Sequence, residues 1–563
     1  MPISNTSSMM SGQEKSKNTL RHALGISRLR PGQHEIIQSV LDGQDTLAVM
    51  PVGIGKSLCH KLPDLNMPGT TLVVSRLVTL MKDQAGKIGV AGIEPAQTMS
   101  SIGKQAGQDS LQNNRHTYSD VVFVTPERLA DPDFILTLQH TTISLFVVDE
   151  AHCISQRGHD FRQAYLELGN AAKALGHPPV LALSATGTQE VINDINRHLG
   201  RDSMRVVNAG IYRANLNYRV LPVVSVEEKL DALKALLQET EGSGIIYAAT
   251  VKAAEELHAA LNEAGVDAVL YHGRLAAKLR DRSRHQFTHG ESRIMIATNA
   301  LGLEIDKSDI RFVIHYQIPG NLERYYQESG RAGRDGEPAS CILFYQVQDK
   351  RIQHFFLARH YPGQDEIRKV YKVMQKLASE NVALDLTRIQ GHIADLSIGR
   401  LKATVKLLQT AGVIAIDEYH CYRILKPEAT PAELAGLGKI YSEKDKYDRQ
   451  ALERMVFYAE TGFCRWKVFL EYFGEEVEWE RCGECDNCLQ PPTRALPSRP
   501  AILERVRKPA PRLPQTAAFL PGSLVRVPKV GEGKVVKATG EQVTIVFPDS
   551  RVRTFLRGYV QSV

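Results

Sequence analysis

The run AVMPVGIGKS, residues 48–57, indicates the fold most directly, because an apolar segment ending in Gly-x-Gly-Lys-Ser is typical of a strand, a phosphate-binding loop and a helix. Backbone N–H groups of such a loop can surround a β-phosphate. We expect Lys56 to reach the β- and γ-phosphates and the Ser57 hydroxyl to bind Mg²⁺. Met50 replaces the first glycine of the usual pattern, so the loop alone leaves an ordinary strand–turn–helix open.

A second apolar run, LFVVDEAH at residues 145–152, supplies the acidic partner that a phosphate-binding loop needs. Asp149 follows the apolar residues directly, and we expect it to hold the Mg²⁺ through water. Glu150 is expected to orient and deprotonate the attacking water. The two runs together predict hydrolysis of a nucleoside triphosphate.

The composition is that of a globular protein with several domains. The chain has 563 residues, of which 43% are hydrophobic and 23% are charged, and this length suits three to five domains. The net charge of +6 fits a polyanionic partner without demonstrating one. Residues 1–18 are polar, and no apolar run is long enough to span a membrane. We therefore expect a cytoplasmic protein with no membrane contact.

Strands and helices alternate from about residue 20 to residue 345, the pattern of parallel sheets covered by helices. Apolar runs that close on a small or polar residue fall into two similar halves. This predicts an α/β fold of two lobes with a cleft between them. The first half contains TLAVMP, TLVVS, VVFVTP, SLFVVDEA and VLALSAT, and the second contains SGIIYAAT, AVLYHG, RIMIATN, RFVIHY and CILFY.

Several runs within these halves occur in an order typical of one family. They are LRPGQHEII, MPVGIGKSLC, TLVVSRLVTLMKDQ, VTPERL, VVDEAHCISQRGHDFR, IATNALGLEIDKSDIRFVIHY and YYQESGRAGRDG. Through them the sequence resembles the RecQ family of superfamily 2 DNA helicases over about residues 24–345. The resemblance implies two tandem RecA-like helicase lobes that use ATP to unwind duplex DNA. It also implies 3′-to-5′ translocation on single-stranded DNA and a role in DNA repair and recombination.

The resemblance further implies how ATP is bound. Arg30 would stack on the adenine, and Gln33 would hydrogen-bond along the edge of the base. The expected site for ATP and Mg²⁺ contains Arg30, Gln33, Gly53, Gly55, Lys56, Ser57 and Asp149.

The resemblance also implies that three residues of the run YYQESGRAGR reach the γ-phosphate. Gln327, Arg331 and Arg334 stand three or four residues apart, which predicts that they line one helix face. Arg334 is the expected arginine finger, which stabilises charge in the transition state. The predicted catalytic set is Lys56, Asp149, Glu150, Gln327, Arg331 and Arg334.

DNA contacts are also implied by the resemblance. The residues expected to follow one strand are Ser75, Lys82, Thr125, Arg128 and Thr298. The loop SQRGHDFR resembles a loop that senses single-stranded DNA by base stacking. Arg157 replaces its expected tryptophan, and Phe161 is its only aromatic residue, so stacking would pass to Phe161 and the Arg157 guanidinium.

The chain departs from the family pattern in further functional loops. Val52 replaces a threonine, Ile54 replaces a glycine, Arg76 replaces a proline and Glu304 replaces a glycine. Because the residues of the predicted catalytic set are all present, these changes favour altered efficiency over loss of activity.

Four cysteines form a second strong pattern, C-x17-C-x2-C-x2-C. They are Cys464, Cys482, Cys485 and Cys488. Four soft ligands at this spacing predict a tetrahedral Zn²⁺ site of structural type, with free thiols or an iron–sulfur cluster as alternatives. The surrounding run YAETGFCRWKVFLEYFGE resembles the zinc module of RecQ proteins.

Between the second lobe and the cysteines, residues 370–435 predict a winged helix-turn-helix. Ser397 would cap a helix that carries Arg400, Lys402 and Lys406 toward DNA. In the family this element normally follows the zinc module, so here it would stand upstream. A helical connector without a DNA role is the alternative.

The end of the chain predicts a linker and a small accessory domain. Residues 491–520 are proline-rich and basic, which is typical of an extended linker. Residues 521–563 show short strands broken by glycine and proline and resemble a Tudor-like β-barrel. Its basic residues are Arg526, Lys534, Arg551 and Arg553. Such a barrel can bind a protein partner or nucleic acid, or it can be a plain accessory fold.

The sequence therefore predicts a RecQ-type ATP-dependent DNA helicase that acts on single-stranded and forked double-stranded DNA, cytoplasmic and associated with a bacterial nucleoid. An RNA-directed helicase of the DEAH group and a DNA-binding scaffold with a weakened ATPase remain alternatives. The expected divisions are a disordered N-terminus over 1–19, lobe 1 over 20–205, lobe 2 over 206–345, a connector and winged-helix segment over 346–435, the zinc-binding module over 436–490, the linker over 491–520 and the barrel over 521–563.

Overall fold

The structure is a computed structural model, and it divides into two compact units, Met1–Leu496 and Pro497–Val563. The residues that it describes are 29, 32–51, 55–56, 58–64, 67–75, 120–155, 162–185, 187–298, 305, 307–360, 362–380, 382–393, 395–417, 421–427, 429–491, 519–527, 531–539, 542–548, 552–556 and 560–562.

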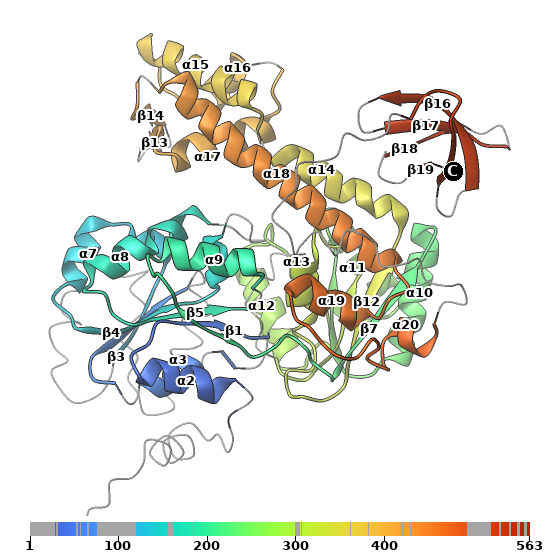
Figure 1. The fold of residues 1–563 in the computed structure, drawn as a ribbon, viewed down its shortest axis with the longest axis horizontal. Helices are drawn as coiled ribbons and strands as arrows, with labels where there is room; N and C mark the ends of the chain where they lie inside the picture. Colours follow the sequence, from blue (N-terminus) through green and yellow to red (C-terminus); the bar gives the residue numbers. More distant parts are fainter. Residues whose placement is uncertain are drawn as a thin grey trace, which may run out of the picture. The chain divides into compact units, whose positions relative to one another are not determined.

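The first sheet is parallel throughout and has the strand order β3-β2-β4-β5-β1-β6. All strands except the edge strand β6 are buried on both faces because their runs are largely apolar, as expected for a parallel sheet covered by helices. One face packs on α2 and α3, and the other on α7, α8 and α9 (Figure 1). The strands are β1 (Thr46–Val49), β2 (Thr70–Val74), β3 (Asp120–Val124), β4 (Ile143–Val148), β5 (Val180–Ser184) and β6 (Arg205–Asn208). The helices are α2 (Gln33–Leu41), α3 (Leu58–Asp64), α6 (Pro126–Leu129), α7 (Pro132–Leu138), α8 (Leu168–Ala174) and α9 (Gln189–His198), with 3-10 turns η1 (Ala151–Ile154) and η2 (Gln163–Glu167).

The second sheet is also parallel, in the order β7-β12-β11-β8-β10-β9. The predicted α/β fold with two parallel-sheet lobes is therefore confirmed. Its strands are β7 (Leu216–Pro222), β8 (Ser243–Tyr247), β9 (Ala268–Tyr271), β10 (Ile294–Ala297), β11 (Ile310–His315) and β12 (Ala339–Tyr345). Its helices are α10 (Val226–Glu239), α11 (Val251–Glu263), α12 (Ala277–Thr288) and α13 (Leu322–Ser329).

The predicted boundary between the lobes, at residues 205 and 206, is wrong by a few residues. β6 begins at Arg205 and pairs with β1, so the first sheet extends to Asn208. The second sheet begins at Leu216 with β7, which pairs with β12. Both strands lie at sheet edges, and their alternating or exposed residues lack the apolar runs of the central strands.

The cysteine-bearing segment shares a hydrophobic core with the second sheet. This segment contains α19 (Arg465–Phe473) and α20 (Asp486–Leu489). Trp466 is 2% exposed, packs edge-on against Tyr218 of β7, and donates from Nε1 to the Leu216 carbonyl at 3.1 Å. The segment predicted as a separate module is thus joined to lobe 2 through one buried cluster.

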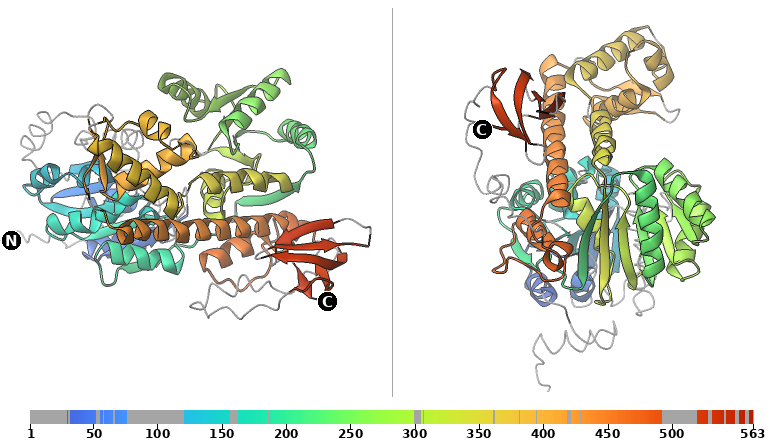
Figure 2. Two further views of the ribbon diagram at one scale, coloured as in Figure 1. Left: turned by 90° about the horizontal axis from the view of Figure 1, so that it is seen from above. Right: turned by 90° about the vertical axis from the view of Figure 1, so that its right-hand side faces the viewer.

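One long helix, α18 (Pro431–Glu460), connects the cysteine-bearing segment to the preceding helices (Figure 2). Thr430 caps it in a capping box, in which Thr430 N donates to Glu433 Oε2 at 2.8 Å. The helix has 30 residues and spans about 45 Å. The predicted boundary at 435 and 436 is wrong, because it falls inside α18.

The segment before α18 has its own core, formed by three helices and a short hairpin. Ser397 caps α17, as predicted, by accepting from Arg400 N at 3.4 Å. The elements of this core are α15 (Gln364–Ser379), α16 (Leu386–Gly391), α17 (Ile398–Thr410), β13 (Ile414–Ile416) and β14 (Tyr422–Ile424). They are preceded by η4 (Val347–Asp349) and α14 (Lys350–His360).

The second compact unit contains an antiparallel sheet in the order β18-β17-β16-β15-β19. Alternate residues such as Val525 and Val527 point into a small apolar core. The strands are β15 (Leu524–Val527), β16 (Gly531–Thr539), β17 (Gln542–Val546), β18 (Val552–Leu556) and β19 (Gln561–Ser562). The linker predicted before it lies almost wholly outside the described residues, as does the N-terminus over 1–19. Within the described part of the chain, no helix is both long and apolar enough to cross a membrane.

Candidate nucleotide site and metal centre

The two predicted acidic residues lie at the carboxyl edge of the first sheet. Asp149 directly follows β4, and its backbone N–H donates to the Val74 carbonyl at 2.9 Å. The Ser75 hydroxyl, at the end of the neighbouring strand β2, lies 3.5 Å from Asp149 Oδ2. Ligands bind outside the carboxyl ends of parallel strands in open α/β sheets. The edge that carries Asp149 is therefore the place where a nucleotide is expected.

Glu150 has an unusual backbone conformation for a residue with a side chain. Its φ of 51° and ψ of 46° lie in the left-handed region, which costs energy for residues other than glycine and is found at functional sites. Glu150 is 7% exposed, and its Oε2 lies 4.0 Å from Lys56 Nζ. The strained turn thus brings the predicted base to the predicted phosphate-binding lysine.

His152 connects Glu150 to the neighbouring strand β5. Its Nδ1 lies 3.3 Å from Glu150 Oε2 and 3.5 Å from Ser184 Oγ at the end of β5. The imidazole is 1% exposed. Sequence reasoning gave His152 no role, although it stands two residues after Glu150 in the DEAH run. The structure places it as the side chain that orients Glu150.

Gln33 contacts the phosphate-binding loop directly. It is 2% exposed, and its Nε2 donates to the Gly55 carbonyl at 3.2 Å. Gly55 has a φ of 82°, and a Cβ added there would lie 3.3 Å from Gln33 Nε2, so a side chain would be strained. Arg30, Gly53 and Ser57 lie outside the described residues, as do the departures Val52, Ile54, Arg76 and Glu304.

The predicted helix face with Gln327, Arg331 and Arg334 is wrong. Helix α13 ends at Ser329 with Gly330 as its C-cap, so only Gln327 lies on the helix. Residues 330–337 form a turn, which we call the arginine turn, because it carries both arginines. Glycine after a helical run is the sequence signal that could have placed this end.

The positive charges of both arginines act to lower the pKa of Tyr247, the last residue of β8. Arg331 is 4% exposed and Arg334 is half-buried. Burial raises the pKa of Tyr247 to about 12, although the positive charges of Arg331 and Arg334 act in the opposite direction. Their side chains therefore lie near the end of β8, whereas the backbone of the arginine turn lies at the amino edge of the second sheet, where Gly333 N donates to the carbonyl of Ile310, the first residue of β11, at 2.8 Å.

The residues predicted to contact DNA differ in exposure. Ser75 and Thr298 are each 4% exposed, and Thr125 is half-buried before α6. Arg128 pairs with Asp131 at 3.2 Å and stacks over the Phe134 ring at 4.8 Å. Lys82, Arg157 and Phe161 lie outside the described residues.

The predicted DNA-binding residues of α17 point in two directions. Arg400 Nε donates to Glu366 Oε2 at 3.1 Å, which holds α17 against α15. Lys402 and Lys406 are exposed and stand one helical turn apart. The two lysines, rather than Arg400, form the basic surface of this helix.

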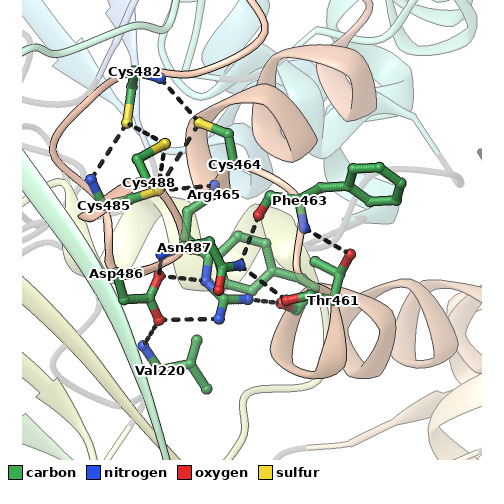
Figure 3. Close-up of polar contacts among 11 residues, drawn as sticks. Val220, Thr461, Phe463, Cys464, Arg465, Cys482, Cys485, Asp486, Asn487 and Cys488 are labelled. Atoms are coloured by element: carbon green, nitrogen blue, oxygen red, sulfur yellow. Dashed lines mark hydrogen bonds and ion pairs between the residues drawn. The ribbon is translucent and has the colours of Figure 1, made fainter. Parts of the chain in front are cut away.

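The four predicted cysteines meet in one cluster (Figure 3). Their sulfur atoms all lie within 4.8 Å of one another. Backbone N–H groups point at the sulfurs: Cys482 N lies 3.3 Å from Cys464 Sγ, and Arg465 N lies 3.4 Å from Cys485 Sγ. Four thiol groups gathered in this way fit the donor set of a tetrahedral metal ion. Four protein ligands are the set found in structural rather than catalytic zinc sites.

A buried ion pair attaches the cysteine cluster to β7. Arg465, next to Cys464, donates to both oxygens of Asp486, at 2.9 Å and 3.0 Å. Asp486 Oδ2 also accepts from Val220 N of β7 at 2.8 Å (Figure 3). Arg465 is 4% exposed, and a bidentate pair with a satisfied carboxylate is favourable in such a place.

Three family models match the chain. A DEAD/DEAH box helicase model matches residues 30–195, a helicase conserved C-terminal domain matches residues 228–336, and a RecQ zinc-binding model matches residues 434–489. The last model contains all four cysteines of the cluster.

Curated proteins similar to this chain carry related names. "Probable ATP-dependent DNA helicase RecS" of Bacillus subtilis is 34% identical, over 82% of this chain and 89% of its own. "ATP-dependent DNA helicase RecQ" of the same organism is 33% identical, over 85% and 68%. "ATP-dependent DNA helicase RecQ" of Pasteurella multocida is 31% identical, over 84% and 62%.

Proposed function

This chain belongs to the RecQ family of ATP-dependent DNA helicases, and we propose that it couples ATP hydrolysis at the first sheet to 3′-to-5′ movement along single-stranded DNA. The family and the enzyme class predicted from the sequence are confirmed. The observation that carries the proposal is the approach of Lys56, Glu150 and His152 beside Asp149 at one sheet edge.

In the proposed mechanism, Lys56 binds the β- and γ-phosphates of ATP, and Gln33 and Arg30 bind the adenine. Mg²⁺, held through Asp149 and Ser57, would neutralise charge on the phosphates. Glu150 accepts a proton from the water that attacks the γ-phosphorus, while the bond to the β–γ bridging oxygen breaks and ADP leaves. His152 keeps the Glu150 carboxylate in place, since it contacts the same oxygen that faces Lys56.

The arginine turn is proposed to complete this site. Arg334, with Arg331 and Gln327, would approach the γ-phosphate and stabilise the charge that develops there. Departure of phosphate would release these contacts and so couple hydrolysis to movement of the lobes along DNA.

Zinc is the metal that we propose for the cysteine cluster. The four sulfurs and the N–H groups that face them support a structural site. Because Asp486 also binds the backbone of β7, the bound metal would stabilise lobe 2 as well. Four thiolates could also hold iron, but the matching family model is a zinc-binding one.

Contacts with DNA or with a protein partner are proposed for three regions. One strand of DNA would lie along Ser75, Lys82, Thr125, Arg128 and Thr298, and Arg157 and Phe161 would stack on its bases. Helices α15, α16 and α17 with the hairpin β13–β14 would act as a winged helix on duplex DNA. The C-terminal sheet would form a Tudor-like barrel that binds a protein partner, in a bacterial cytoplasm near the nucleoid.

The double substitution Lys402→Ala and Lys406→Ala tests the winged-helix proposal. We expect about a tenfold loss of affinity for duplex DNA in 0.1 M salt and a smaller salt dependence, because two phosphate contacts disappear. Affinity for a short single strand should stay within about twofold. The matched control is Lys372→Ala with Lys376→Ala, an exposed pair at the same spacing on α15. Equal losses in both double variants would mean that α17 has no special role.

Unwinding assays test the helicase proposal and its direction together. With ATP and Mg²⁺, we expect unwinding of 3′-tailed and forked duplexes but not of 5′-tailed ones. The Lys56→Ala variant is the control for contaminating activity. Unwinding of 5′-tailed duplexes but not of 3′-tailed ones would show movement in the 5′-to-3′ direction instead. Stronger stimulation of the ATPase by RNA than by DNA of equal length would favour an RNA substrate. ATP turnover no greater than that of Lys56→Ala would leave only a DNA-binding scaffold.

A further inference from the structure

The segment that joins the two sheets holds the backbone of the arginine turn. Arg213 lies in this segment, between β6 and β7, and is 8% exposed. Its Nη1 donates to the Gly330 carbonyl at 2.8 Å, and its Nη2 donates to the Ala332 carbonyl at 2.8 Å and to the Gly333 carbonyl. One guanidinium thus binds the backbone on both sides of Arg331.

Asn215 binds the same turn two residues further on. Its Nδ2 donates to the Gly333 carbonyl at 2.8 Å and to the Glu337 carbonyl at 2.9 Å. Gly333 has a φ of 54°, and a Cβ added there would lie 2.5 Å from Asn215 Nδ2. The turn is therefore packed directly onto this amide, with no room for a side chain at residue 333.

The joining segment is itself attached to α13. The Tyr326 hydroxyl donates to the Ile211 carbonyl at 2.9 Å. The contacts run in both directions, from the helix to residue 211 and from residues 213 and 215 to the turn after the helix. Gly330 is the C-cap of α13, and residues 332–337 lie beyond the helix, so their carbonyls have no partner within it. Arg213 and Asn215 satisfy four of these carbonyls and so hold the turn in place.

We propose that Arg213 is a positioning residue for ATP hydrolysis, with Asn215 as its support. Its guanidinium sets the backbone of the arginine turn, and through it the place of Arg334 at the γ-phosphate. This inference rests on the proposed role of the arginine turn. A planar fork that reaches three carbonyls cannot be reproduced by lysine, whose ammonium is a compact charge on a flexible stem. A catalytic group displaced by about 1 Å can lose about 10²-fold in rate.

The test is Arg213→Lys, measured as ATPase at saturating single-stranded DNA. We expect kcat to fall about 10- to 100-fold, while KM for ATP stays within about twofold. The matched control is Arg293→Lys in the same lobe. Arg293 donates to the carbonyls of Thr240 at 2.7 Å and of Leu237 at 2.5 Å, at the end of α10 rather than on the arginine turn. The Arg293→Lys variant should keep kcat within about twofold of the unaltered protein, although it loses a comparable number of hydrogen bonds to backbone carbonyls.

Asn215→Asp provides a second variant of unchanged size if Arg213→Lys does not fold. Its carboxylate cannot donate to the two carbonyls and repels them, so kcat should fall while KM for ATP is kept. A kcat for both variants no lower than that of Arg293→Lys would overturn the inference.

The double variant Arg213→Lys with Arg334→Ala separates positioning from a general structural effect. If Arg213 acts through the arginine turn, the lysine substitution should lower kcat less than about threefold once Arg334 is gone. An undiminished loss in that background would overturn the inference. If Arg334→Ala alone leaves kcat unchanged, the proposed role of the turn fails, and the inference fails with it. If Arg334→Ala is slow but Arg213→Lys matches its control, the inference alone fails.

Discussion

Replacing Glu150 with glutamine should lower kcat for ATP hydrolysis by about 10²- to 10⁴-fold, the range that a general base contributes. Glutamine keeps the shape of the side chain but cannot accept the proton of the attacking water. The Kd for ATP should stay within about threefold, because Lys56 and the loop that bind the phosphates are unchanged. DNA-stimulated ATPase and binding of a fluorescent ATP analogue measure the two quantities separately.

Two controls give the Glu150→Gln result its meaning. Glu167→Gln changes the same charge at an exposed site of the first lobe and should keep kcat within about twofold. Lys56→Ala should weaken ATP binding as well as turnover, since Lys56 is expected on the phosphates. Glu150→Gln activity within threefold of the unaltered protein would show that another group takes the proton.

Loss of the metal from the cysteine cluster should have the largest effect on stability. Cys485 is 1% exposed and belongs to the core that α19 and α20 share with the second sheet. Structural zinc sites contribute to folding directly, with apparent binding energies of about 10–16 kcal/mol in zinc-finger peptides. We expect Cys485→Ser to lose the metal and to lower Tm by about 10 °C or more. Thermal unfolding, with the metal content measured in parallel, tests this.

Cys421→Ser is the control for the cysteine substitution. Cys421 is half-buried and lies outside the cluster, so its loss should leave both Tm and metal content unchanged. Metal analysis should find one zinc per chain, whereas bound iron with visible absorption would identify an iron–sulfur cluster. A Cys485→Ser protein without metal but with an unchanged Tm would show that the shared core does not depend on the metal.

The sequence was sufficient for the central strands and for the residues at their ends. β4 and β5 are largely apolar runs of the kind that parallel sheets bury, and Asp149 and Glu150 must follow β4 at its carboxyl edge. The cysteine cluster was equally visible, because three of its cysteines stand three residues apart and the fourth stands 18 residues before them. In both cases the signal lies within a short stretch of chain.

Other features had no such local signal. The edge strands β6 and β7 can be identified only from the strands with which they pair, because their own side chains are partly exposed and do not form an apolar run. The left-handed turn at Glu150 follows from how η1 leaves the sheet. The end of α13 at Ser329 was missed because the charged residues of the arginine turn continue a helical spacing, although the glycines between them break the helix.

The sequence by itself determined the family, the two parallel sheets, the acidic pair at the strand ends and the cluster of four cysteines. Each of these depends on residues that are neighbours in the chain or on runs with a fixed period. Only the tertiary structure decided that Arg213 binds the arginine turn, 117 residues away, and that Asp486 binds Val220, 266 residues away. Such contacts depend on which elements the fold brings together, and no local spacing of residues records that choice.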